Sequence, residues 1–346
     1  MLEAAFAIPG DLDAPTGGYA YARHLLAELP GAGVRARHLI LPDGFPDPDE
    51  ADLTAAAQRL AAVPAEQPLL VDGLAYGALP PLLLRQVRAP LVALVHHPLA
   101  LEAGLSPERR DALTASERAA LALARSVVAT SGHTARLLAS DYGVPADKIA
   151  VAEPGTAPAP RAAGTRVPFA LVAVGAVTPR KAYPLLVAAL AGIAGDWRLT
   201  VVGSLDRDPT ETARLLTAIA AADLRGRVVL AGAVDDTDRD ALLDAADLLV
   251  SASLLEGYGM ALAEALARGL PVVASTGGAA GETVPAGCGL AVPPGDGAAL
   301  RAALARMIAE PRLRRNCAEA AWAAGQRLPR WRDTAARVAA VLKAAA

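Results

Sequence analysis

Apolar runs alternate with helical stretches along the first half of the chain. Five short runs rich in Val, Leu and Ala are typical of buried strands: residues 4–8, 34–41, 69–72, 91–95 and 127–130. Helices are expected between them, starting at Tyr19, Ala51, Leu79, Ser106 and Ser131. This alternation predicts a parallel sheet with helices on both faces, which is a Rossmann-like domain.

The same alternation resumes in the second half. Strands are expected at residues 169–174, 199–203, 228–231, 247–251 and 272–274. Helices are expected from Tyr183, over residues 260–267, and toward Ala309 behind a cap at 293–296. A last helix is expected from about Trp331, with Trp331 and Val338 on one face. The pattern therefore predicts a second Rossmann-like sheet.

Residues 147–164 interrupt the alternation with Pro, Gly and Ala and show no helical period, so we expect a linker there. A chain of 346 residues is also too long for one ordinary core. We expect a first Rossmann-like domain over residues 1–165, a second over 166–330, and a C-terminal helix over 331–346.

Composition limits the kinds of partner that we expect this protein to bind. The formal net charge is −3, no basic block is present and aromatic residues make up 3%, which argues against nucleic-acid binding. No apolar run approaches the roughly 18 residues of a membrane span, and the first residues lack the basic flank of a secretory signal. We expect a cytoplasmic protein with at most peripheral contact at the inner face of the membrane. Cys288 and Cys317 have no metal-ligand spacing and are expected to be buried.

The stretch 247–275 carries the clearest chemistry. An apolar strand leads through Gly257, Tyr258 and Gly259 into a helix that begins at Met260. The first N–H groups of such a helix have no partner and face the end of the strand, so the turn attracts anions such as phosphate. Glu256 precedes the turn and Glu264 lies about two helical turns on, roughly 12 Å further along. Two carboxylates so spaced suit hydroxyls at opposite ends of an extended ligand.

This Glu-x7-Glu stretch, with Ser253, Gly269, Pro271 and Ser275 around it, resembles the donor-site motif of the retaining family 4 glycosyltransferases. That resemblance implies the GT-B fold, in which two Rossmann-like domains face each other across a cleft and a C-terminal helix crosses back to the first domain. It also implies that Glu256 contacts sugar hydroxyls, that Glu264 contacts the ribose of a nucleotide-sugar, and that the amides from Gly257 to Met260 bind the diphosphate and the sugar.

A second glycine turn lies in the first half. Gly17 and Gly18 separate the first strand from its helix, and the resemblance implies that this turn closes over the acceptor and the donor phosphate. A tight connection that merely needs small residues is an equal alternative. The missing Gly-x-Gly-x-x-Gly fingerprint argues against a nicotinamide dinucleotide.

His96 and His97 follow the strand at 91–95, where open α/β sheets bind ligands. The family has a His at the corresponding strand end that contacts the donor sugar. His96 fits this place, and His97 stands where an Asp is frequent. The doublet leaves either histidine open as the site residue.

Arg180 and Lys181 enter a helix six residues after the strand-ending Gly175. The spacing is close to a P-loop, but a second glycine and the Ser or Thr that binds magnesium are missing, so an ATPase is disfavoured. The resemblance implies that Lys181 binds the diphosphate, with Arg180 beside it. Many family members have an Arg directly after the Gly, and this chain has Ala176 there.

The implied function is transfer of a hexose from a nucleoside diphosphate sugar to an acceptor hydroxyl on a glycan or lipid, with retention of configuration. His96, Glu256, Lys181 and Arg180 would act in catalysis. No cofactor and no metal are expected, because Asp206 and Asp208 suit a loop and a helix cap better than a metal site. The alternatives are a GT-B relative with epimerase chemistry and a nucleotide-sugar-binding protein without catalysis.

Overall fold

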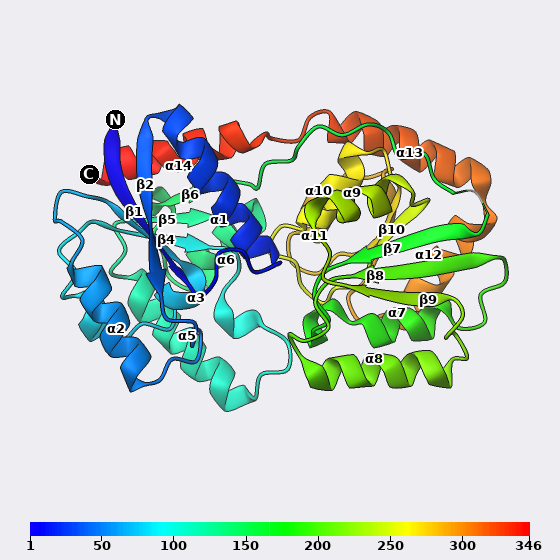
Figure 1. Ribbon diagram of the computed structural model, residues 1–346, viewed down its shortest axis with the longest axis horizontal. Helices are drawn as coiled ribbons and strands as arrows, with labels where there is room; N and C mark the ends of the chain where they lie inside the picture. Colours follow the sequence, from blue (N-terminus) through cyan, green and yellow to red (C-terminus); the bar gives the residue numbers. More distant parts are fainter. Residues whose placement is uncertain (166) are drawn as a thin grey trace. The chain divides into compact units, whose positions relative to one another are not determined.

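The apolar runs form two parallel six-stranded sheets in the computed structural model, with strand orders β2-β1-β3-β4-β5-β6 and β12-β11-β10-β7-β8-β9 (Figure 1). The structure describes residues 1–165 and 167–346. It divides into a first unit, Met1–Gly155 with Pro329–Ala346, and a second unit, Thr156–Leu328. The prediction of an α/β protein with two Rossmann-like sheets is confirmed.

The first unit contains β1 (Leu2–Pro9), α1 (Gly17–Glu28), η1 (Leu29–Ala32), β2 (Val34–Leu41), α2 (Glu50–Ala61), β3 (Leu69–Asp72), α3 (Gly73–Tyr76), α4 (Pro81–Leu84), β4 (Leu91–Val95), η2 (Leu99–Leu101), α5 (Pro107–Leu121), β5 (Ser126–Ala129), α6 (Gly132–Ser140), η3 (Ala146–Lys148), β6 (Ile149–Val151) and α14 (Trp331–Ala345).

The second unit contains β7 (Phe169–Val174), η4 (Pro179–Lys181), α7 (Tyr183–Leu190), β8 (Trp197–Val202), α8 (Pro209–Ala221), β9 (Val228–Gly232), α9 (Asp236–Asp244), β10 (Leu248–Ser251), α10 (Met260–Ala267), β11 (Val272–Ser275), α11 (Ala280–Thr283), β12 (Gly289–Val292), α12 (Gly297–Ala309) and α13 (Pro311–Gly325).

Both faces of each sheet are covered, because alternate strand residues point to opposite sides. In β7, Leu171 and Ala173 join a core with α7, α8 and α12, whereas Val172 joins a core with α9 and α10. Figure 1 shows α7 and α8 on one side of this sheet and α9 and α10 on the other. In the first sheet, α2, α5 and α6 share one core, and α1 and α14 contact each other on the remaining face.

The C-terminal helix α14 belongs to the first unit. Trp331 and Val338 are both buried, as the apolar face predicted. The ring of Trp331 lies edge-on to Tyr21 of α1, with the ring centroids 5.6 Å apart. The expected return of the last helix to the first domain is therefore confirmed.

Two expectations about elements are wrong. The helix expected from Leu79 is only the four-residue helix α4, which begins at Pro81 behind Pro80, because proline is tolerated at the first position of a helix but not within it. The expected linker includes strand β6, which extends the first sheet beside β5.

The boundary between the units also differs from the expected one. Residues 156–165 belong to the second unit, since the N–H groups of Ala162 and Ala163 donate to carbonyls of that unit. The expected boundary residue, Arg166, lies outside the described residues.

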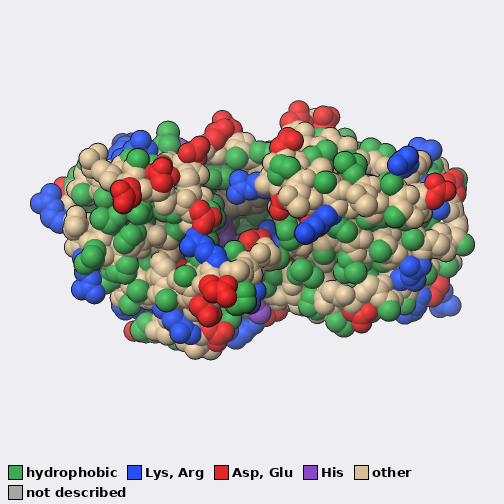
Figure 2. All heavy atoms as spheres, turned by 90° about the horizontal axis from the view of Figure 1, so that it is seen from below, with side chains coloured by type: hydrophobic (Ala, Val, Ile, Leu, Met, Phe, Trp, Pro, Cys, Tyr) green, Lys and Arg blue, Asp and Glu red, His purple; other side chains and the backbone are tan. Residues whose placement is uncertain are grey.

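Several local expectations are confirmed. Ser131 caps α6, Asp208 caps α8 and Asp296 caps α12, each by accepting a backbone N–H. Cys288 and Cys317 are buried free thiols. Within the described residues, no helix is long and apolar enough to cross a membrane. On the face shown in Figure 2, acidic and basic side chains are interspersed among apolar ones.

Candidate functional site

The loop between β10 and α10 forms a glycine turn at the start of a helix in the second unit. Gly259 caps α10 with φ of 96° and ψ of 58°, a left-handed conformation that favours glycine. No side chain caps this helix. Its first N–H groups, which include that of Met260, are therefore available to an anion, and the helix dipole favours one there.

A second glycine loop fixes the backbone of Glu256. The Glu256 N–H donates to the Gly277 carbonyl at 3.1 Å, and the Ala279 N–H donates to the Glu256 carbonyl at 2.8 Å. A Cβ added at Gly278, where φ is +67°, would lie 2.3 Å from the Glu256 oxygen. The close backbone approach expected for the loop after β11 is confirmed, and it sets the position of the Glu256 side chain.

The Glu256 carboxylate lies between two cations. Lys181 Nζ is 2.7 Å from its Oε1, and an Arg180 guanidinium nitrogen is 3.6 Å from its Oε2. Burial alone would raise the pKa of Glu256, but the charges of Lys181 and Arg180 lower it below its usual value. Glu256 is 8% exposed and ionised at neutral pH, so it is a fixed acceptor for hydroxyl groups.

Glycine at the end of β7 makes room for Lys181. Gly175 has φ of +142°, and a Cβ there would lie 2.5 Å from Lys181 Cε. The Tyr183 hydroxyl donates to the Gly175 carbonyl at 2.8 Å. The lysine stem therefore crosses the strand end on its way to Glu256, a path that a larger residue would close.

Arg180 holds the loop that leads to Glu256. Its guanidinium donates to the Leu255 carbonyl at 3.0 Å, and its own carbonyl accepts the Leu254 N–H at 2.8 Å. The structure thus brings Arg180, Lys181 and Glu256 together. Arg180 therefore positions the loop before Glu256, in addition to the catalytic role that we expect for it from the sequence.

Glu264 lies on the second turn of α10, where it meets Arg239. The Arg239 Nε is 3.6 Å from Glu264 Oε2. Burial raises the pKa of Glu264, against the opposing effect of Arg239 and Arg268. This glutamate is therefore not a solvated surface residue. Between the two glutamates, Tyr258 is buried, and its carbonyl accepts the Thr283 hydroxyl.

His96 lies at the end of β4 in the first unit and faces the glycine turn of α1. The α1 helix begins at Gly17 behind Thr16, and a Cβ added at Gly18 would lie 3.5 Å from His96 Nε2. Tyr21 packs edge-on against the imidazole at a centroid distance of 5.3 Å. Folding therefore places Gly18 against His96, although the two are far apart in the sequence.

The two histidines differ in their partners. His97 Nε2 is 3.1 Å from Glu102 Oε2 on the following segment. The His96 carbonyl accepts the hydroxyls of Thr130 and Thr134, each at 3.2 Å, and these residues lie at the end of β5 and on α6. His96 is therefore the histidine that lies against the glycine turn.

Two buried carboxylates near these histidines, Asp72 and Glu117, were not predicted from the sequence. Asp72 ends β3, is 4% exposed, and has Oδ2 3.4 Å from His96 Nε2. Glu117 of α5 is also 4% exposed and accepts the N–H groups of Leu99 and Ala100 at 2.8 and 3.2 Å. Burial raises the pKa of Glu117 to about 7, although its two amide donors oppose the rise. The sequence could have indicated Asp72, because it ends an apolar strand like the one that His96 follows. No sequence pattern indicated Glu117.

No metal centre is formed by the described residues, since none of their His, Cys, Asp and Glu side chains gather in a group of three or more suited to an ion. Asp208 accepts the Glu211 N–H at 2.9 Å and so caps α8. The Asp206 N–H donates to the Ser204 hydroxyl. The Asp-x-Asp sequence therefore forms a loop and a helix cap.

Comparisons with known proteins agree with this arrangement. The family model described as Glycosyl transferases group 1 matches residues 166–323, and that of Glycosyltransferase Family 4 matches residues 20–159. The MMP alpha-(1->4)-mannosyltransferase of Mycolicibacterium hassiacum is 28% identical over 322 residues, which cover 87% of this chain and 76% of that protein.

Solved structures share the fold over almost the whole chain. Sucrose-phosphate synthase from Thermosynechococcus elongatus matches with a TM-score of 0.84 and 23% identity, covering 99% of both chains. Anabaena HepE in complex with UDP and glucose matches with a TM-score of 0.79 and 19% identity, covering 99% of this chain and 100% of that one.

Proposed function

This chain belongs to the group 1, family 4 glycosyltransferases of the GT-B fold, and on that premise we propose that it transfers a hexose from a nucleoside diphosphate sugar to an acceptor hydroxyl, with retention of the anomeric configuration. The observation that carries the proposal is the Lys181–Glu256 pair, which lies at the open N-terminus of α10.

The leaving group in this reaction is a nucleoside diphosphate, whose developing charge must be stabilised. Lys181 and Arg180 carry two positive charges against the one negative charge of Glu256, which leaves one positive charge beside the helix N-terminus. A lysine ammonium has three donors, so Lys181 can hold Glu256 and a phosphate oxygen together. The N–H groups from Gly257 to Met260 supply the remaining donors.

The sugar and the nucleoside would be held by carboxylates. We assign Glu256 to the sugar hydroxyls because its lowered pKa keeps it ionised. Glu264 would accept the ribose hydroxyls, with Arg239 balancing its charge. His96, which lies beside Asp72, Tyr21 and Gly18, would contact the donor sugar. The acceptor hydroxyl belongs to a glycan or a lipid.

The proposal needs neither a cofactor nor a metal, because fixed cations and amides can meet the diphosphate charge. The HepE structure is a complex with UDP and glucose, which supports UDP-glucose as the first donor to try. The rival functions are epimerisation of the nucleotide-sugar and binding without catalysis.

A donor panel separates these functions. The protein is incubated with isotope-labelled nucleoside diphosphate sugars and a mixture of glycan and lipid acceptors, and products are read by mass spectrometry. A labelled acceptor together with free nucleoside diphosphate supports transfer. Conversion of one nucleotide-sugar into another would mean an epimerase, and tight donor binding with no product would mean a binding protein.

A further inference from the structure

A pocket opens in the first unit among segments that follow β2, β3 and β4. Its volume is about 320 Å³, within the lower range of small-molecule sites. The lining comes from the loop after β2, the start of α2, the turn after α3 and residues 109–116 of α5: Pro46, Asp47, Pro48, Leu53, Ala78, Arg109, Ala112, Leu113 and Ser116. These segments follow the carboxyl ends of parallel strands, and so does His96, so pocket and histidine belong to the same edge of the sheet.

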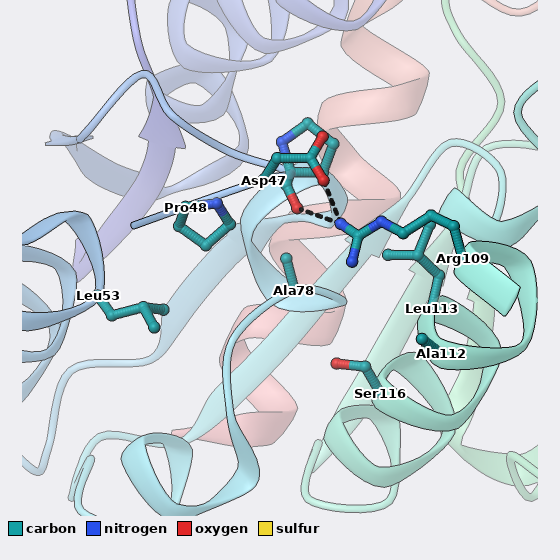
Figure 3. Close-up of a pocket in the computed structure, with 9 residues that line it drawn as sticks. Asp47, Pro48, Leu53, Ala78, Arg109, Ala112, Leu113 and Ser116 are labelled. Atoms are coloured by element: carbon teal, nitrogen blue, oxygen red, sulfur yellow. Dashed lines mark hydrogen bonds and ion pairs between the residues drawn. The ribbon is translucent and has the colours of Figure 1, made fainter. Parts of the chain in front are cut away.

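The wall of the pocket combines apolar surfaces with one guanidinium and one carboxylate. Arg109 extends from α5 toward Asp47, with Leu53 on the opposite side (Figure 3). The Arg109 guanidinium pairs with the Asp47 carboxylate and donates to the Pro46 carbonyl at 3.4 Å. Asp47 is 72% exposed, so this ion pair contributes little to stability, and its groups are available to a ligand.

We propose that this pocket binds the acceptor as an uncharged sugar. The proposal rests on the proposed function and specifies its acceptor. A carboxylate accepts and a guanidinium donates several hydrogen bonds, so Asp47 and Arg109 together match adjacent hydroxyls of a sugar ring. The apolar lining of Pro46, Pro48 and Leu53 suits the C–H faces of such a ring.

Local charge argues against an anionic acceptor. Arg109 and Asp47 cancel each other in the lining. Residues 43–52, which form the loop and the start of α2, contain five carboxylates and no Lys or Arg: Asp43, Asp47, Asp49, Glu50 and Asp52. A phosphate or carboxylate on the ligand would be repelled by this segment.

The pocket is also connected to the segment that follows His96. Leu113, in its wall, packs with Leu99 of η2, and Ser116 donates to the Gly77 carbonyl at 2.8 Å. One residue further along α5, Glu117 accepts the Leu99 and Ala100 N–H groups. An acceptor in the pocket would therefore contact the same helix that holds the residues after the two histidines.

The test is direct binding, without any donor, of methyl α-glucoside, methyl α-mannoside and the 6-phosphates of glucose and mannose, measured by saturation-transfer NMR. The wild-type protein is expected to bind at least one methyl glycoside more tightly than either sugar phosphate. Ala112→Trp, which fills the pocket from its exposed rim, is expected to weaken this binding at least tenfold. Ala115→Trp is the matched control, since Ala115 is exposed on the same helix outside the lining, and it should bind as wild type does.

Variants that remove a single charge test whether the ligand is a neutral sugar or an anion. Arg109→Leu and Asp47→Asn are both expected to weaken glycoside binding about tenfold, whereas Arg110→Leu, on the exposed side of α5, should not. If Asp47→Asn instead tightens sugar-phosphate binding, the ligand is anionic and the proposal is wrong. Absence of binding by all four probes to the wild-type protein would also overturn it. Because no donor is present, either result leaves the transferase assignment to be judged by the donor panel alone.

Discussion

Glu256 and Glu264 lie on either side of the start of α10, and they are expected to act on different parts of the donor. Glu264→Gln should weaken binding of the free nucleoside diphosphate by about ten- to hundredfold, since a hydrogen bond to a charged group contributes about 1.5–3 kcal/mol. Glu256→Gln should leave this affinity nearly unchanged and chiefly lower turnover. Titration calorimetry with UDP and steady-state kinetics measure the two effects. Equal UDP affinity of the wild type and Glu264→Gln would remove the ribose assignment.

The raised pKa of Glu117 predicts that the stability of the protein depends on pH. Its pKa is raised by burial from about 4.5 to about 7 in the folded state. Its contribution to the free energy of unfolding is therefore full below pH 4.5 and is lost as the pH rises through 7. A pKa rise of this size corresponds to about 3 kcal/mol.

Glu117→Gln stays neutral at every pH, but its NH2 group replaces one of the two oxygens that accept the Leu99 and Ala100 N–H groups, which costs a constant amount of stability. Between pH 4.5 and pH 8 the difference in stability should shift by up to about 3 kcal/mol in favour of the variant, because only the wild type has a group that ionises there. Urea unfolding of both proteins from pH 4.5 to pH 8 tests this expectation. A difference in stability that is constant with pH would show that Glu117 has an ordinary pKa.

At the scale of elements, the loop after β11 is expected to control the donor site. A methyl group at Gly278 would lie 2.3 Å from the Glu256 carbonyl, so Gly278→Ala should displace Glu256 and lower turnover at least tenfold. Gly143→Ala is the matched control: φ is +69° there, but no atom lies within 4 Å of the added Cβ. Both variants are expected to lose about 1–2 kcal/mol of stability, because alanine is unfavourable in a left-handed conformation. Equal activity of the two variants would mean that the contact with Glu256 is unimportant.

Elements with strong local patterns could be predicted from the sequence. The strands β1 to β5 and β7 to β11 coincide with apolar runs, and the caps of α6, α8 and α12 were recognisable from single residues. Strands β6 and β12 were missed because each lies at the edge of its sheet, is only partly buried and pairs with a single neighbour, β5 or β11. A short strand of this kind is determined by its neighbour more than by its own residues.

The candidate site was predictable where it is contiguous in the sequence. Glu256, the glycine turn and Glu264 lie within one stretch, and Lys181 is one of three lysines in the chain. The Asp72–His96 pair joins the ends of the neighbouring strands β3 and β4, and the Glu117 contacts join residues 18 and 17 positions apart. Such contacts follow from the strand order and from the packing of α5, which a local pattern does not contain.

At the scale of the whole molecule, the balance of charge leads us to expect metal-independent activity. Activity should survive exhaustive chelation with EDTA, because Lys181, Arg180 and the N-terminus of α10 supply the positive charge. Asp206→Ala and Asp208→Asn should stay active, and the asparagine retains the cap of α8. If EDTA abolished activity and magnesium or manganese restored it, a metal ion would replace the positive charge that other family members have as an Arg at the position of Ala176.

Retaining transfer from a nucleoside diphosphate sugar is decided by the anomeric configuration of the product. The wild-type protein is given an α-configured UDP-hexose with a 13C label at the anomeric carbon, together with the acceptor identified by the donor panel. The one-bond carbon–hydrogen coupling of the product is then measured by NMR. We expect an α-linked product, whose formation falls at least tenfold in Lys181→Ala. A β-linked product would contradict the proposed function, and so would an α-linked product formed equally well without Lys181.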